Sequence, residues 1–413
     1  MRRAVIVCAI VAALWLAPGA LASGWCGGGE ESSGDRPDAV TAQQVHAVVA
    51  LPSDAADSFA TDAGRLADDV NSMLTWWQGQ DPTRIPRFDQ AVLAGGTCLD
   101  ISFVRLPETG AAYTSVGASG TFGAIASGLA RTGSPYKDYL VYYDGPSVET
   151  NVCGVGGTGA FNTGFSFAVV LLQGCGSVPS DTIATHELLH ALGAVPPGDP
   201  HTCPGDPGHP CDSTTDVLYP YASGGPLSSL VLDYNHDDYY AHSGSWPDIQ
   251  DSSWLHRLDL PQESLGVAFS GAGRITSDLP GVDCTAVCAT QWDQGAVVTL
   301  TAAPAANDRF VHWSGACTGR GECALKLAAS ATATAVFGPL RVPLKLSVTG
   351  RGTISCSRTC AKTIRGGDPL LLRAVPTKGY RFLRWSGACK GATPICRPAT
   401  DFALSVHATF KRR

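Results

Sequence analysis

Hydrophobic residues in the first half of the chain recur with two different spacings, one typical of strands and one typical of helices. Residues Gln44 to Leu51 alternate and are rich in β-branched side chains, which predicts a strand, whereas Asp54 to Gln78 carries apolar side chains at helical spacing. Further apolar runs predict strands at Leu99 to Leu106, Asp138 to Tyr143 and Phe165 to Leu172, separated by Gly-rich loops. The last run is nearly all apolar, so we expect a central strand. A second helix follows it, and this order predicts an α+β domain with a mixed sheet.

The back half of the chain repeats itself. Gly271 to Thr276 aligns with Gly350 to Ser355, each is followed by a CxxxC pair and an alternating apolar run, and both copies contain Phe-x-x-Trp-Ser-Gly-Ala-Cys, ending at Cys317 and Cys389. This pattern predicts two tandem all-β modules at residues 262–339 and 340–413, in which Trp and Phe form the cores. The modules resemble the divergent internalin B-type repeats of secreted bacterial proteins.

The first residues have the order of a secretory signal peptide. Met1-Arg2-Arg3 is followed by an apolar run and then by Ala20-Leu21-Ala22, which predicts a signal peptide at 1–22 and a folded domain at 23–261. No later segment has the length of a membrane helix. We therefore expect a secreted, extracellular protein without a transmembrane segment after cleavage.

Cysteine usage agrees with an oxidising compartment. Of the 15 cysteines, one lies in the predicted signal peptide, and the others form seven candidate disulfide pairs, most of them close in sequence. The pairs are Cys153 with Cys175, Cys203 with Cys211, Cys284 with Cys288, Cys317 with Cys323, Cys356 with Cys360, Cys389 with Cys396, and the remaining Cys26 with Cys98.

Charge is distributed unevenly along the chain. Residues 341–413 contain fifteen Lys and Arg against two Asp, a balance of +13 in a chain whose net charge is −7. A basic tail favours anionic polymers or a cell-envelope surface, and a solvated charged face without a partner is the alternative. No nucleic-acid partner is predicted.

The motif that carries chemistry is His186-Glu187-Leu188-Leu189-His190. Histidines four residues apart lie on one face of a helix, where both imidazoles can reach one Zn²⁺, and the intervening Glu187 is placed to act as the general base of hydrolysis. A core helix with locally bonded histidines is the alternative. Gly193 is expected to end the helix.

A catalytic zinc site needs a third protein ligand and an open position. No Glu occurs between His190 and Glu263, and in the pattern HExxHxxGxxH the third histidine position is taken here by Pro196. We predict His201 as the third ligand, delivered by a proline-rich loop. The alternatives lie in the same region: His209, Asp199, Asp212 and Asp216.

The segment from His186 through His201, Cys203, His209 to Asp212 and Asp216 to Pro220 resembles secreted, metzincin-related zinc metallopeptidases, particularly of actinobacteria. The resemblance covers about residues 25–257 and implies a metzincin-like domain with the mixed sheet, the long helix and the HExxH helix. Leu218 stands where these enzymes carry the methionine of the turn beneath the zinc. The resemblance also implies that Tyr219 or Tyr221 stabilises the developing oxyanion.

A downstream segment has oxygen-bearing side chains at alternating positions. Asp233, Asn235 and Asp237 therefore form a candidate calcium site, although the pattern is not an EF-hand loop. An acidic surface loop is the other interpretation.

Two classes of function follow from these features. The first is a zinc endopeptidase that hydrolyses a protein or peptide substrate and is held at an envelope or polymer by its repeats. The second is an extracellular adhesive protein in which the peptidase-like domain is structural or inactive.

Overall fold

The computed structural model describes residues 25–28, 34–93, 96–129, 134–146, 152–157, 166–174, 176–221, 225–357, 360–400 and 402–413. The predicted signal peptide lies outside these residues. The chain divides into two compact units, 1–260 and 261–413.

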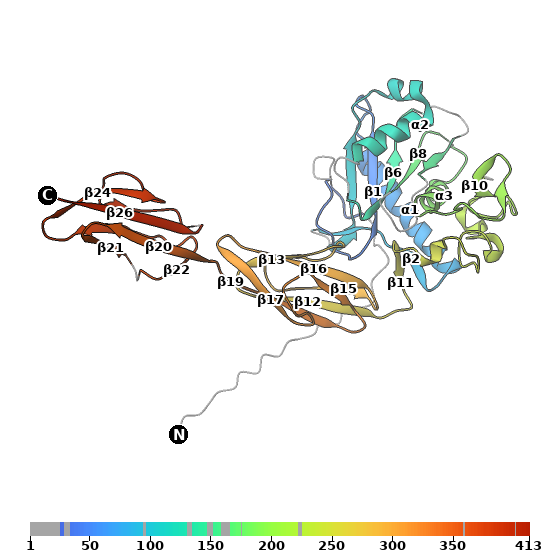
Figure 1. Ribbon diagram of the computed structural model, residues 1–413. Helices are drawn as coiled ribbons and strands as arrows, with labels where there is room; N and C mark the ends of the chain where they lie inside the picture. Colours follow the sequence, from blue (N-terminus) through green and yellow to red (C-terminus); the bar gives the residue numbers. More distant parts are fainter. Residues whose placement is uncertain are drawn as a thin grey trace. The chain divides into compact units, whose positions relative to one another are not determined.

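The first unit is built on a five-stranded sheet, shown in Figure 1. Its order is β5 (Ile101–Arg105), β1 (Gln44–Leu51), β6 (Lys137–Tyr143), β8 (Phe167–Leu171) and β7 (Gly154–Gly156). The first four strands are parallel and β7 is antiparallel, so the predicted mixed sheet is confirmed. β8 is fully buried and lies inside the sheet between β6 and β7, as expected, and β6 is the middle strand.

Helices cover both faces of this sheet (Figure 1). α1 (Phe59–Gln80) and α3 (Ser180–Ala191) pack on one face, against Ala47, Val49 and their neighbours. α2 (Gly110–Leu129) packs on the other face, against Val48 and Ala50. Alternate side chains of one strand thus enter two different cores, and burying each large aliphatic side chain contributes roughly 1.5–3 kcal/mol.

The helix α2 contradicts the sequence interpretation of this Gly-rich segment as a loop. The helix is kinked at Gly117, which has φ 75° and joins two helical segments. Tyr113, Ile125 and Leu129 are buried against the sheet. Tertiary burial therefore outweighs the cost of glycine in a helix, about 1 kcal/mol per residue relative to alanine.

Short elements complete the first unit and carry the loops around α3. They are β2 (Arg84–Pro86), β3 (Gln90–Leu93), β4 (Gly96–Leu99), β9 (Thr202–Cys203), β10 (Asp206–Pro210), β11 (Leu255–Arg257), and the 3₁₀ turns η2 (Leu227–Ser229), η3 (Tyr234–His236) and η4 (Ile249–Asp251). β9 and β10 form a hairpin, and β11 pairs with β2.

The second unit consists of the two predicted β modules. One contains the sheets β15-β12-β19-β17 and β14-β13-β16-β18, and the other contains β22-β20-β26-β24 and β21-β23-β25. The strands are β12 (Gln262–Ser270), β13 (Gly273–Ser277), β14 (Asp283–Cys284), β15 (Cys288–Asp293), β16 (Val297–Pro304), β17 (Asp308–Gly315), β18 (Cys323–Lys326), β19 (Ala331–Pro339), β20 (Arg341–Thr349), β21 (Gly352–Cys356), β22 (Thr363–Arg365), β23 (Leu372–Pro376), β24 (Tyr380–Gly387), β25 (Ile395–Cys396) and β26 (Leu404–Arg412).

The same local structure explains the shared Phe-x-x-Trp-Ser-Gly sequence in both copies. The buried rings of Trp313 and Trp385 donate Nε1–H to the carbonyl oxygens of Gly321 and Thr393, at 2.8 and 2.9 Å. Two residues after each Trp a glycine has φ near 85°, and at Gly387 a Cβ would lie 2.2 Å from a backbone oxygen of the paired strand. The tryptophans are module core, as predicted.

Six disulfides join described cysteines, in the expected pairs: Cys26–Cys98, Cys203–Cys211, Cys284–Cys288, Cys317–Cys323, Cys356–Cys360 and Cys389–Cys396. Cys153 is also disulfide-bonded, and its expected partner Cys175 lies outside the described residues. Among the described helices, none combines the length and apolarity that crossing a bilayer requires.

Candidate metal centre

The helix α3 presents His186 and His190 on one side and its apolar residues on the other. Leu188 and Leu189 are fully buried in the core shared with α1. Near the start of the helix, Ser72 of α1 donates a hydrogen bond to the Asp181 carboxylate at 2.6 Å. Gly193, with φ 94°, follows the last turn and ends the helix as expected.

A third imidazole joins the pair, and it belongs to His209. The Nε2 atoms of His186, His190 and His209 lie 3.2 Å from one another in all three pairings. In a tetrahedral site the ligand–ligand distance is about 1.63 times the metal–ligand distance, so these nitrogens can share a point about 2.0 Å away, the length of a Zn–N bond. The trio has the geometry that one zinc ion requires.

The expectation that His201 completes the trio is therefore corrected. Its Nδ1 atom lies 2.7 Å from Oδ1 of Asp238, and it belongs to a separate cluster of side chains. His209 lies on β10, which pairs with β9 and is closed by the Cys203–Cys211 disulfide. The hairpin turns the later histidine toward α3, a result that counting residues from His190 does not reveal.

Hydrogen bonding at the far side of the imidazoles favours metal binding at Nε2. His186 Nδ1 lies 2.7 Å from the carbonyl oxygen of Val217, so Nδ1 carries the proton and donates it, leaving a lone pair on Nε2. The Asp206 carboxylate lies 2.9 Å from Nδ1 of His209, although not in hydrogen-bonding alignment. Ring nitrogens that converge at this distance can offer their lone pairs to one metal cation.

The titration of the pair on α3 agrees with neutral ligands. Burial, and then the nearby His209 ring, lowers the pKa of His186 to about 4. Burial, with His186 as the next cause, also lowers the pKa of His190 well below its ordinary value. Imidazoles that stay neutral at physiological pH keep their lone pairs available for a metal.

Glu187 is buried between the motif helix and the edge strand β7. Burial raises the pKa of its carboxyl to about 8, and a hydrogen bond from the Gly156 backbone N–H opposes this rise. The strand comes very close: a Cβ at Gly154 would lie 2.6 Å from Cγ of Glu187, and a Cβ at Gly156 would lie 2.4 Å from Cβ of His190. Only glycine fits at these two positions.

The segment after the hairpin contacts α3 through Val217. Asp216 accepts hydrogen bonds from the backbone N–H of Leu218 and Tyr234 and from the Tyr239 hydroxyl, which fixes the turn. Leu218 is fully buried in the core with α3. Asp216 is thus a structural residue of the turn, which argues against it as a zinc ligand.

The two tyrosines after this turn differ in exposure. Tyr219 is half-buried, and Tyr221 is 78% exposed with its ring centroid 6.1 Å from that of Tyr219. A role for Tyr219 in oxyanion stabilisation stays a prediction.

The residues of the candidate calcium site, Asp233, Asn235 and Asp237, lie in a tight turn. The buried Asp233 carboxylate accepts backbone N–H groups of Asp237, Asp238, Tyr239 and Tyr240, so its oxygens organise the turn. Asp237 instead belongs to the cluster with His201, and Asn235 adopts φ 69° in the 3₁₀ turn η3. The alternating pattern coincides with this turn, and calcium binding by Asp233 and Asn235 stays a prediction.

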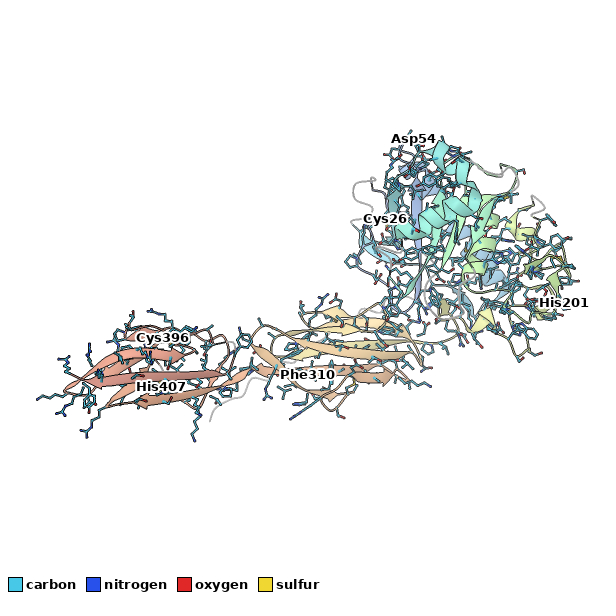
Figure 2. The ribbon with its side chains drawn as sticks, turned by 45° about the horizontal axis from the view of Figure 1, so that its top comes forward. Cys26, Asp54, His201, Phe310, Cys396 and His407 are labelled. Carbon is cyan, nitrogen blue, oxygen red and sulfur yellow. A yellow bond between two sulfur atoms is a disulfide. The ribbon has the colours of Figure 1, made fainter. Side chains whose placement is uncertain are left out.

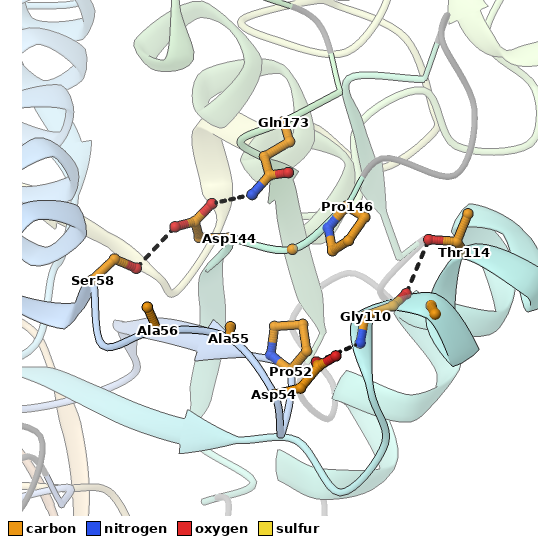
Figure 3. A pocket seen from close by; sticks show the side chains of 12 residues that line it. Pro52, Asp54, Ala55, Ala56, Ser58, Gly110, Thr114, Asp144, Pro146 and Gln173 are labelled. Atoms are coloured by element: carbon orange, nitrogen blue, oxygen red, sulfur yellow. Dashed lines mark hydrogen bonds between the residues drawn. The ribbon is translucent and has the colours of Figure 1, made fainter.

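Two other polar features of the first unit have internal partners. The Lys137 ammonium lies 2.7–2.8 Å from carboxylate oxygens of Asp35, Asp38 and Asp89, beside the acidic group around His46. A hollow of about 750 Å³ opens at the carboxyl ends of β1 and β6 (Figure 3). Its Asp144 carboxylate accepts hydrogen bonds from Ser58 and Gln173, so the lining is already paired.

Comparison with known families identifies part of the chain. Both modules match the divergent InlB B-repeat domain. The matched residues are 274–339 and 342–413, about a third of the sequence, so the match describes the second unit. No curated protein matches the chain.

Proposed function

We propose that the first unit is a zinc-dependent peptidase and that the chain acts outside the cell. The convergence of three Nε2 atoms at 3.2 Å beside the buried Glu187 carries this proposal. The disulfides and the repeat match, typical of secreted bacterial proteins, support the extracellular setting.

The side chains have separable roles. His186, His190 and His209 would hold the metal, and a zinc ion there would supply a Lewis acid that polarises a carbonyl and lowers the pKa of water. Glu187 takes a proton from water and returns it to the leaving nitrogen. Its carboxyl is buried and hydrogen-bonded to Gly156, which limits its orientation for this transfer.

The edge strand β7 offers a place for an extended substrate. It pairs with β8 along one side, and within the described part of the sheet it is the terminal strand. A peptide that adds to such an edge forms main-chain hydrogen bonds, and Glu187 lies directly beneath the glycines of β7. This arrangement supports a peptide rather than a small ester as the substrate.

The second module supports retention at an anionic polymer or envelope surface. Every described Lys and Arg of residues 341–413 is exposed. In Figure 2, side chains with nitrogen ends project from the module that carries Cys396 and His407. Exposed charges of one sign attract polyanions and are screened by salt. Retention on immobilised polyphosphate at low salt, reduced in a variant with Arg381→Glu and Arg384→Glu, tests this part.

Glu187→Gln tests the peptidase in the full chain. We expect casein hydrolysis to fall by at least about 1,000-fold while bound zinc, measured by elemental analysis, stays unchanged. The exposed Glu108 provides the matched control Glu108→Gln, which should retain activity. Normal turnover in Glu187→Gln would refute the proposed base.

An adhesive protein with an inactive first unit is the second candidate, favoured by the repeat match alone. It predicts polymer retention together with no hydrolysis of casein or peptide libraries by the zinc-loaded wild type. Activity that a chelator removes and zinc restores decides against it.

A further inference from the structure

A second group of metal-binding side chains lies apart from the trio. Ligand atoms of His201, Asp212, Asp237 and Asp238 all lie within 4.8 Å of one another. The Nδ1 atom of His201 is 2.7 Å from Oδ1 of Asp238 and 3.7 Å from Oδ1 of Asp237. The His201 side chain is 40% exposed and lies at the margin of the first unit in Figure 2, so a cation can reach it from solvent.

Buried carboxylate oxygens without partners provide an independent observation. Asp238 is fully buried and Asp199 is only 7% exposed, and in each the Oδ2 atom has no hydrogen-bond donor. Oδ1 of Asp237 is likewise buried and without a donor. The carboxyls of Asp199 and Asp238 are within hydrogen-bonding reach of each other although both are acceptors when ionised. His201 pairs with Oδ1 of Asp238, and the oxygens that remain without a donor can take a metal ion in addition.

We propose that this cluster binds a second Zn²⁺ ion, held by His201 and by the carboxylates of Asp212, Asp237 and Asp238, with Asp199 beside them. The donor set decides the cation. Zinc accepts imidazole nitrogen together with carboxylate oxygen, whereas calcium is bound by oxygen ligands alone. Four protein ligands fill a tetrahedral site, so this ion has a structural role.

The site joins two loops that surround the trio. Asp199, His201 and Asp212 flank the disulfide-closed hairpin that carries His209, and Asp237 and Asp238 belong to the turn organised by Asp233. A zinc ion between them fixes the base of the hairpin and thereby the position of His209. The second ion therefore prepares the first site, and its binding does not depend on peptidase activity.

The test counts zinc in the full chain, made with Glu187→Gln so that it cannot digest itself. Metal-free protein is titrated with Zn²⁺, and bound metal is measured after gel filtration. We expect two zinc ions per chain in this parent, one in Asp238→Asn, one in His209→Ala and none in the double variant. The exposed Asp68→Asn is the matched control and should keep two.

Each alternative result is informative. One ion in the parent, retained in Asp238→Asn and lost in His209→Ala, overturns the second site and leaves the peptidase proposal intact. Two ions in the parent and one in His209→Ala, with both retained in Asp238→Asn, also overturns it. No zinc in any chain refutes the proposed trio as well. Displacement of one zinc by equimolar Ca²⁺ refutes the choice of cation.

A second variant guards against a folding defect in Asp238→Asn. The His201 side chain is 40% exposed, so His201→Ala should fold and should also bind one ion. Zn²⁺ should raise its Tm less than that of the parent. An equal rise with two bound ions would overturn the proposal.

Discussion

The Nδ1 atom of His186 donates a hydrogen bond to the carbonyl oxygen of Val217 across 2.7 Å. This contact joins the motif helix to the turn that follows the His209 hairpin, and it selects the tautomer in which Nε2 is free. The turn therefore contacts the site through a backbone carbonyl, and the buried Leu218 packs in the core beside it.

The Cys203–Cys211 bond should control zinc affinity. Replacing both cysteines by serine frees the hairpin that holds His209, and we expect the trio to bind zinc roughly 10- to 100-fold more weakly, the effect typical of losing support around a ligand. Competition with a chromophoric chelator measures this. The Cys284/Cys288 double serine variant, which alters a disulfide of the first module, should leave the affinity unchanged.

Gly156→Ala should disturb the site by a steric clash. The added Cβ would lie 2.4 Å from Cβ of His190 and 2.9 Å from the backbone oxygen of Glu187. Overpacking of this kind costs about 1–3 kcal/mol, and we expect at least a roughly tenfold loss of hydrolysis. Gly64→Ala in α1 meets no atom within 4 Å and should be neutral or slightly stabilising. Equal activities of the two variants would contradict the close approach of β7.

Asp138 should make the first unit less stable as pH rises. Burial raises the pKa of this carboxyl to about 8, against the accepted hydrogen bond from Ser166 N–H. The folded state thus binds a proton that the unfolded state releases near pH 4, so the free energy of unfolding falls between about pH 4 and pH 8.

Asp138→Asn removes this dependence while keeping an acceptor for Ser166. We expect the variant to match the wild type near pH 4 and to exceed its stability by roughly a few kcal/mol near pH 8, as measured by urea unfolding. Parallel pH profiles for the two proteins would show that the carboxyl is ionised in the folded state.

Trp385→Ala should destabilise the second module selectively. The ring is buried and its Nε1–H donates to Thr393, so truncation should cost about 3–5 kcal/mol. Calorimetry of the full chain should show a lower Tm for one transition. Trp313→Ala, the equivalent change in the first module, should lower a different transition, and identical thermograms would mean that the modules unfold as one.

Sequence patterns predicted the strands well because burial on both sheet faces leaves a strong apolar signal. β1 was placed at Gln44–Leu51, and α3 carries His186 and His190 as expected. α2 was missed because five of its twenty residues are glycine, and its helical state depends on packing against β6 and β8. Local composition does not reveal contacts with residues that are distant in the sequence.

The candidate site was half predictable for a similar reason. His186 and His190 are fixed by helix periodicity, whereas the third imidazole depends on how a disulfide hairpin folds back. Its best signal was the Cys203–Cys211 pair, which encloses His209 and excludes His201. The prediction of His201, the histidine nearer to His190 in sequence, did not take this disulfide into account.

The two modules of the second unit share their core residues but differ in surface charge. Residues 262–339 contain four Lys and Arg and six Asp and Glu, a balance of −2, whereas residues 341–413 carry +13 on the same arrangement of Trp, Gly and disulfides. The chain consequently contains its own matched control. Any ligand that distinguishes one copy from the other must be responding to side chains outside the shared core.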